Sequence, residues 1–150
     1  MSAVLDVSGL KTHFFTHAGV VKAVDGVDFT VSKGEIMGLV GESGSGKSIT
    51  GFSIIGLIDS PGRIVEGSIK FNGEEIANAK EERLQSLRGN RIAMIFQDPM
   101  MTLNPVLRVD KQMMESILAH EAVSKQTAWE RSRDALGLVG DTSAEERFRA

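Results

Sequence analysis

The stretch VGESGSGKSIT, residues 40–50, joins an apolar run to a segment with helical character through a loop of glycine and serine. The apolar run, residues 36–40, predicts a strand buried on both faces, because its apolar residues do not alternate with polar ones. Between Lys47 and Ile58, apolar side chains fall nearly all round a helix, so we expect that helix to be largely buried. The stretch therefore predicts a strand, a glycine loop and a helix in immediate succession.

Residues 41–48 match the pattern G-x-x-x-x-G-K-[ST] through Gly41, Gly46, Lys47 and Ser48. Glycine allows several backbone N–H groups to converge on one anion, because no Cβ stands in the way. The helix that follows directs its free N–H groups and the positive end of its dipole at the same point. Lys47 is expected to reach the β- and γ-phosphates and Ser48 to bind Mg²⁺. The pattern predicts a site for a nucleoside triphosphate.

The composition restricts the class of protein. The 150 residues suit one domain with one core. The formal net charge is −3, whereas nucleic-acid-binding domains are usually clearly basic, so nucleic acid is not expected as the main partner. There is no cysteine, which excludes a disulfide framework and a thiolate metal site. No apolar run approaches the roughly 18 residues that a membrane-spanning helix needs.

Apolar patterning and turn residues predict the remaining elements. Alternation over residues 20–32 predicts a half-buried strand in an antiparallel pairing. Short strands are also predicted at 3–7 and 66–71, and Asn72-Gly73 is expected to form a tight turn. A second apolar run, residues 92–96, predicts another buried strand. Helices are expected at residues 80–88, 110–121 and 124–137, the last of them capped by Ser124.

A second motif follows the strand predicted at 92–96, where Gln97 stands in the sequence RIAMIFQDPMMTLNPVLRV, residues 91–109. The segments VKAVDGVDFTVSKGEIMGLVGESGSGKS, residues 21–48, and IFQDPMMTLNP, residues 95–105, together resemble the ATP-binding subunits of ABC importers of the oligopeptide and dipeptide type. In that family, a glutamine at the position of Gln97 marks the Q-loop. The resemblance extends over about residues 3–150.

The resemblance implies an α/β fold, that of the P-loop NTPase core of an ABC nucleotide-binding domain. It carries an N-terminal antiparallel β subdomain and the start of a helical subdomain. The whole chain, 1–150, would be the N-terminal part of one such domain, which is then incomplete. Residues 1–97 would form the β subdomain with the P-loop core, and residues 98–150 the Q-loop and the start of the helical subdomain.

The resemblance also implies ATP and Mg²⁺ as cofactors and assigns roles to residues of the site. Gln97 would bind Mg²⁺ and position the attacking water. Lys47 would be the other catalytic residue, and Ser48 the second Mg²⁺ ligand. An aromatic side chain ahead of the loop stacks on adenine in this family; Phe15 is the candidate, Phe14 and His17 are competitors, and a core role for Phe15 is the alternative. The residues expected to hold the nucleotide are Gly41, Glu42, Ser43, Gly44, Ser45, Gly46, Lys47, Ser48, Ile49 and Phe15.

The implied partners are a second ATPase subunit, as homodimer or heterodimer, and transmembrane permease subunits. An external solute-binding protein would act indirectly, and the expected location is cytoplasmic, peripheral on the inner face of the cell membrane. Met100, Met101, Leu103 and Val106 would either cover the core or form a docking surface for the membrane partner. As a full-length subunit, the protein would hydrolyse ATP to import peptides or similar solutes.

Several family motifs are not recognisable in the chain: the Ser-Gly-Gly-type signature, the Asp-Glu pair that holds Mg²⁺ and activates water, and the later histidine. We therefore expect this chain alone to lack useful ATP turnover. Strands 36–40 and 92–96 would lack neighbours, which predicts poor stability or aggregation. The alternative function is a non-hydrolysing nucleotide-binding or regulatory fragment, and a small-molecule kinase is a weaker third hypothesis.

The remaining charged and titratable clusters predict no further site. His13 and His17 lie in an extended segment without a third ligand, which disfavours a metal site. A basic cluster lies among glutamates and is interpreted as a solvated face with salt bridges. Its members are Lys80, Arg83, Arg88 and Arg91, beside Glu74, Glu75, Glu81 and Glu82.

Overall fold

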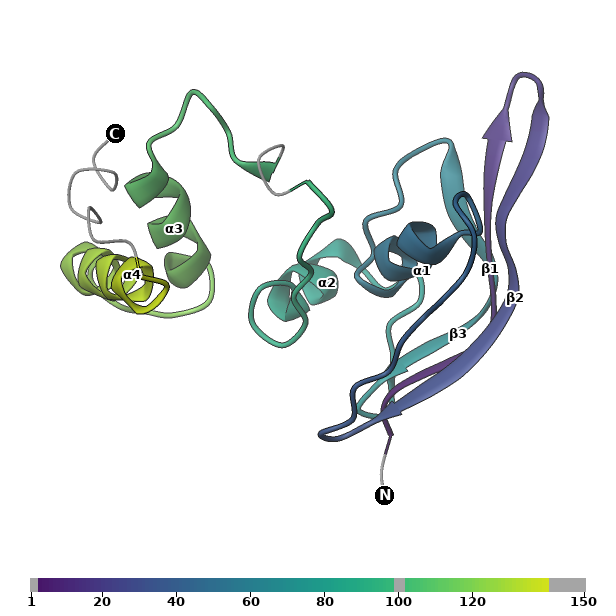
Figure 1. Cartoon of the computed structure of the whole chain (residues 1–150), viewed down its shortest axis with the longest axis horizontal. Coiled ribbons are helices and arrows are strands. Elements are labelled where there is room, and N and C mark those ends of the chain that lie inside the picture. Colours follow the sequence, from purple (N-terminus) through teal and green to yellow (C-terminus); the bar gives the residue numbers. More distant parts are fainter. Residues whose placement is uncertain (1–2, 99–101, 141–150) are drawn as a thin grey trace. The chain divides into compact units, whose positions relative to one another are not determined.

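The computed structural model describes residues 3–98 and 102–140. The chain forms two compact units, Met1–Met94 and Ile95–Ala150, and each unit is described by itself (Figure 1). Among the described residues, no helix is both long enough and apolar enough to cross a membrane.

An antiparallel sheet organises the first unit (Figure 1). Its strands are β1 (Ala3–Thr16), β2 (Gly19–Ser32), β3 (Gly62–Phe71) and β4 (Glu74–Glu75), in the order β2-β1-β3-β4. The predicted strands at 3–7, 20–32 and 66–71 are confirmed, and two of them extend further than the patterning indicated. The predicted turn is also confirmed, since Asn72 and Gly73 have φ values of 49° and 83°.

The core lies on one face of this sheet, beneath helices α1 (Lys47–Ile54) and α2 (Glu81–Leu87). A buried pair of hydroxyls joins α1 to the sheet, with 2.8 Å between Thr12 Oγ1 and Ser53 Oγ. Ser53 Oγ also donates to Ile49 O at 2.7 Å, so the pair is satisfied within the core. The buried apolar core consists of Val7, Leu10, Val24, Ile69, Ile76 and Leu87.

Helix α1 ends before the predicted Ile58, because Gly56 adopts the left-handed conformation with φ of 65°. Leu57 N–H donates to Phe52 O at 2.8 Å, and Gly56 N–H donates to Ser53 O at 3.2 Å. This pair of bonds is a Schellman motif, the usual way in which a glycine ends a helix. The glycine that weakened the predicted helix is therefore its terminator.

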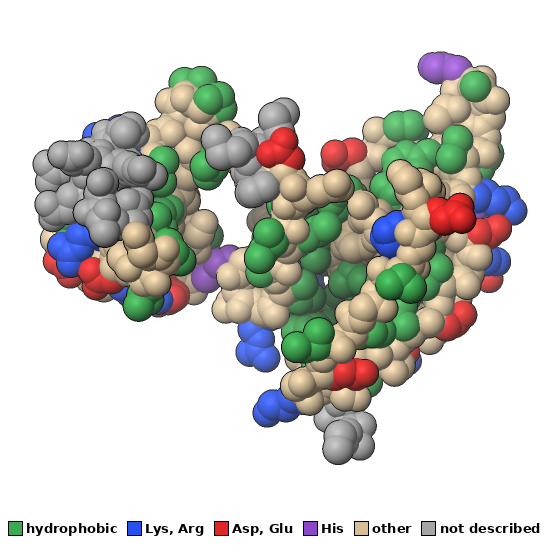
Figure 2. Space-filling view, viewed as in Figure 1, with side chains coloured by type: hydrophobic (Ala, Val, Ile, Leu, Met, Phe, Trp, Pro, Cys, Tyr) green, Lys and Arg blue, Asp and Glu red, His purple; other side chains and the backbone are tan. Residues whose placement is uncertain are grey.

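The two predicted buried strands are absent from the structure. Residues 36–40 form no strand, and Ile36 and Val40 are 99% and 90% exposed. In 92–96, the described backbone forms one isolated bridge, between Arg88 and Ile92, and Ile95 is 93% exposed. An apolar run indicates that burial is favourable, but a strand also needs a neighbour for its N–H and C=O groups, and neither run finds one among the described residues. Hydrophobic side chains consequently lie open on the surface of the first unit (Figure 2).

The side chain of Glu75, in the edge strand β4, bonds to the neighbouring strand β3 and to the residue that follows Ile76. The Glu75 carboxylate accepts hydrogen bonds from the Ser68 hydroxyl and from the N–H groups of Ile69 and Ala77, the latter two at 2.9 Å. Partial burial alone raises the pKa of Glu75, but these hydrogen bonds outweigh it and the pKa is lowered.

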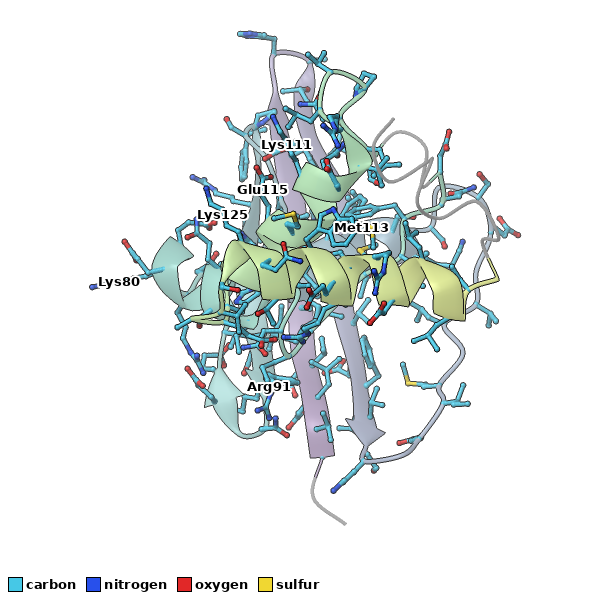
Figure 3. The ribbon with its side chains drawn as sticks, turned by 90° about the vertical axis from the view of Figure 1, so that its left-hand side faces the viewer. Lys80, Arg91, Lys111, Met113, Glu115 and Lys125 are labelled. Atoms are coloured by element: carbon cyan, nitrogen blue, oxygen red, sulfur yellow. The ribbon has the colours of Figure 1, made fainter. Side chains whose placement is uncertain are left out.

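The second unit contains α3 (Val109–Leu118) and α4 (Lys125–Leu138), which pack on each other. Ser124 Oγ accepts a hydrogen bond from Thr127 N–H at 3.0 Å, which confirms the predicted N-cap. Met113 lies on the opposite side of α3 from the exposed Lys111 and Glu115 (Figure 3). Residues Leu103 and Val106 are 46% and 87% exposed and do not cover a core, whereas Met100 and Met101 lie outside the described residues.

Candidate nucleotide-binding site

The glycine loop leads into the N-terminus of α1 and passes directly beside strand β2. Gly44 and Gly46 have φ values of 80° and 90°, a region that other residues rarely adopt. A Cβ on Gly46 would lie 2.2 Å from the backbone oxygen of Ala23 in β2. Glycine is therefore required at Gly46 for two reasons, the backbone conformation and the close approach to the sheet edge.

The first turn of α1 is open toward this loop. Gly46 is the N-cap residue, and no side chain caps the helix. Thr50 N–H closes the first intrahelical bond, to Gly46 O at 2.8 Å, and a helix leaves the N–H groups ahead of that bond without an intrahelical partner. Residues 47–49, which carry these N–H groups, line a cavity of about 170 Å³ together with Ala23 and residues 44–46.

The Lys47 ammonium occupies the centre of the loop. Its Nζ donates to Gly41 O and Glu42 O, both at 2.7 Å, and to Ser45 Oγ at 3.2 Å. The positive charge is thus held where the loop backbone converges, next to the positive end of the α1 dipole. The combination favours an anion with several oxygens.

The other predicted loop residues surround this centre. Ser48 is exposed in the first turn of α1, so its hydroxyl can reach a ligand, while the Ile49 side chain packs against the core and leaves its N–H in the first turn. A Cβ on Gly41 would lie 2.5 Å from Ser45 Oγ, so the loop also closes tightly on itself. Glu42 and Ser43 are exposed. The structure therefore brings residues 41–49 together around one point.

Phe15 lies at the end of β1, away from the core. Its ring is 39% exposed, and the Arg63 guanidinium lies over it at 4.2 Å from the ring centroid. The alternative interpretation of Phe15 as a core residue is therefore wrong. Phe15 pairs with Val20 of β2. Ala23, which lies against the glycine loop, is three residues further along β2, or about 10 Å.

The competitors of Phe15 differ in their surroundings. Phe14 is partly buried, and a Cβ on Gly62 would meet its ring at 2.6 Å, so Phe14 packs closely on β3. His17 is exposed in the turn between β1 and β2. Gln97 lies in an exposed bend and belongs to the second unit, whereas the glycine loop belongs to the first.

The predicted salt-bridged face is confirmed for two arginines of the α2 region. Arg83 pairs with Glu74 and Arg88 with Glu81, and these hydrogen bonds lower the pKa of both glutamates. Arg88 makes further contacts, because it also donates to Ile55 O at 2.7 Å at the end of α1. Sequence reasoning missed this role, because Arg88 stands in a stretch of arginines and glutamates that is typical of a solvated, salt-bridged face.

Comparisons with known proteins identify the family of the chain. The sequence profile described as ABC transporter matches residues 24–149. The chain is 47% identical to the oligopeptide transport ATP-binding protein AppD of Bacillus subtilis, over 97% of the chain and 45% of AppD. It is 44% identical to the dipeptide transport ATP-binding protein DppD of Escherichia coli, over 92% of the chain and 42% of DppD.

Solved structures show the same fold. The dimeric structure of MJ0796, a bacterial ABC transporter cassette, has a TM-score of 0.76 and 20% sequence identity, with 89% of this chain and 56% of that chain covered. The chain spans less than half the length of the curated relatives it matches. It belongs to the ABC transporter family, and its fold is that of part of an ATP-binding cassette.

Proposed function

We propose that this chain binds ATP through residues 41–49. The observation that carries the proposal is that three features suited to an anion lie together. They are the open first turn of α1, the Lys47 ammonium, and the loop in which Gly44 and Gly46 are left-handed. A triphosphate would replace the loop carbonyls as the acceptor for Lys47, and the first-turn N–H groups would donate hydrogen bonds to its oxygens.

Mg²⁺ fits the donors that the chain offers. The cation prefers hard oxygen ligands and usually keeps only one or two from the protein beside the phosphates and water. The exposed Ser48 hydroxyl at the first turn is such a ligand. We assign Gln97 to the same cation and to the attacking water, and the partly exposed Phe15 to stacking on adenine. Bound Mg²⁺ would neutralise charge between the β- and γ-phosphates.

Within a longer subunit, we propose that the site hydrolyses ATP to drive import of peptides or similar solutes. The support is the identity to relatives named for oligopeptide and dipeptide transport. Residues 1–97 would supply the β subdomain and P-loop core, and residues 98–150 the start of the helical subdomain. A second ATPase subunit, transmembrane permease subunits and an external binding protein would complete the assembly, with the ATPase subunits in the cytoplasm, peripheral on the inner face of the membrane. A nucleotide-binding role without hydrolysis is the alternative, and ATP turnover by the longer subunit separates the two.

Titration with the fluorescent analogue mant-ATP, with and without Mg²⁺, tests the binding proposal. Lys47→Met removes charge-assisted hydrogen bonds worth about 1.5–3 kcal/mol, so the dissociation constant should rise roughly 10- to 100-fold. Lys33→Met removes the same charge from an exposed turn and should leave binding within about twofold. Equal binding by the two variants, or no binding by the unchanged chain, would contradict the proposal.

A further inference from the structure

Arg88 follows the C-terminal end of α2, and its side chain reaches the C-terminal end of α1, which lies beside α2 in the first unit (Figure 1). Its Nε donates to Ile55 O at 2.7 Å, and its Nη2 donates to Gly56 O. Its Nη1 donates to the Oε1 of Glu81, the first residue of α2, at 2.6 Å. The Arg88 side chain is only 23% exposed, so the two helices are joined by a largely buried side chain.

The two carbonyls that Arg88 binds belong to the C-cap residue of α1 and to the glycine that follows it. The Schellman bonds use Phe52 O and Ser53 O, whereas Ile55 O and Gly56 O lie just beyond them. A cation at this position also interacts favourably with the negative end of the helix dipole. Arg88 thus completes the C-terminal cap of the helix that follows the glycine loop.

The contact between α2 and this end of α1 is close. A Cβ on Gly56 would lie 2.6 Å from Leu84 Cδ1, so α2 packs directly against the glycine that ends α1. The backbone at Arg88 is held as well, because Gly89 N–H donates to Ile92 O at 2.9 Å and Ile92 N–H donates to Leu87 O at 3.0 Å. The guanidinium is therefore presented from a fixed backbone.

Helix α1 is short, so its two ends are not independent. It has eight residues, or about 12 Å of axis, between the carbonyls that Arg88 holds and the N–H groups that open the phosphate loop. A shift or tilt at the C-terminal end moves those N–H groups as well. The charge of Arg88 also offsets the dipole's negative end, which lies within the same short helix.

We propose that Arg88 is a positioning residue for nucleotide binding: by clamping the C-terminal carbonyls of α1 to α2, it fixes the direction in which the first-turn N–H groups meet the phosphates. The inference rests on the proposed ATP-binding function. Arg88 does not touch the nucleotide; it acts through α1.

The test compares Arg88→Met with Arg83→Met in the full 150-residue chain. Both arginines belong to the α2 region and pair with a glutamate, but Arg83 bonds to Glu74 and Ser86 instead of to α1. Displacement of mant-ATP by ATP and by AMP gives a ratio of affinities that reports the contribution of the outer phosphates. We expect Arg88→Met to lower this ratio about two- to fivefold, the size of a charge effect at a helix end, and Arg83→Met to leave it unchanged.

Two further variants separate positioning from general stability. Glu81→Gln removes the ion pair but leaves the bonds from Arg88 to α1, so its ratio should match that of the unchanged chain. Arg88→Lys keeps a cation that can reach one carbonyl and should restore part of the ratio; it also carries the comparison if urea melts show that Arg88→Met is unfolded. An unchanged ratio in both Arg88 variants, or an equal fall in Arg83→Met, would overturn the inference. Failure of the unchanged chain to bind ATP would instead refute the proposed function, and the inference with it.

Discussion

Replacing Gly46 by alanine tests the close approach between the glycine loop and strand β2. The substitution has two effects. At φ of 90°, alanine must adopt a left-handed conformation, which costs about 1–2 kcal/mol. In addition, the new Cβ would lie 2.2 Å from Ala23 O, whereas Cβ contacts under 3.0 Å essentially do not occur, so the loop and the strand must separate. Such overpacking costs about 1–3 kcal/mol more.

Gly44→Ala isolates the first effect. Gly44 has a similar φ of 80°, but no atom lies within 4 Å of the position that its Cβ would take. Its cost should be the backbone strain alone, reduced by about 0.4–1 kcal/mol because alanine restricts the unfolded chain. The same reduction applies to Gly46→Ala, so we expect Gly46→Ala to lower the free energy of unfolding by about 1–5 kcal/mol and Gly44→Ala by about 1 kcal/mol.

Urea melts of both variants measure the difference, and mant-ATP titration measures its effect on the site. Gly46→Ala should also weaken ATP binding at least about tenfold, because displaced first-turn N–H groups lose charge-assisted hydrogen bonds to the phosphates. A Gly46→Ala variant that is no less stable than Gly44→Ala would show that Ala23 does not confine the loop, and the reasoning would fail.

Three further predictions concern the rest of the first unit. Thr12→Val should lower the free energy of unfolding by about 1–2 kcal/mol, and adding Ser53→Ala should cost less than the sum of the two single changes in urea melts, because the hydroxyls share one buried hydrogen bond. Ile36→Lys should reduce aggregation measured by light scattering and leave the free energy of unfolding within about 0.5 kcal/mol, because Ile36 is 99% exposed. The lowered pKa of Glu75 stabilises the fold above the unfolded-state pKa, and this contribution is lost as the pH falls through the folded-state pKa; Glu75→Gln should therefore flatten the acid-side loss in melts between about pH 6 and pH 3.

The elements that sequence predicted well carry their own local causes. Alternation along 20–32 is a property of that strand alone, and the Ser124 cap depends on a hydroxyl and an N–H within one turn. The glycine loop is equally local, because left-handed glycines, a lysine and a helix start all lie within residues 41–48. The glycine loop and the start of the helix after it could therefore be predicted before any fold was known.

The failures come from partners distant in the chain. Apolar runs at 36–40 and 92–96 indicate a preference for burial but contain no information on which strand would pair with them. Arg88 was interpreted as a member of a solvated face because its partner Glu81 is visible in the sequence, whereas its bonds to Ile55 and Gly56 depend on how α2 packs on α1. Gln97 and the stacking role of Phe15 stay predictions.

The hydrogen bonds from Lys47 to Gly41 O and Glu42 O affect how substitutions at this lysine should be interpreted. The ammonium is an internal cross-link that keeps two carbonyl oxygens turned toward it and so preserves the curvature of the backbone. Removing it loosens the receptor as well as deleting a contact with the ligand. The affinity lost on substitution is therefore the sum of a conformational cost in the free protein and a missing charge in the complex, and it overstates the strength of the lysine–phosphate bond itself.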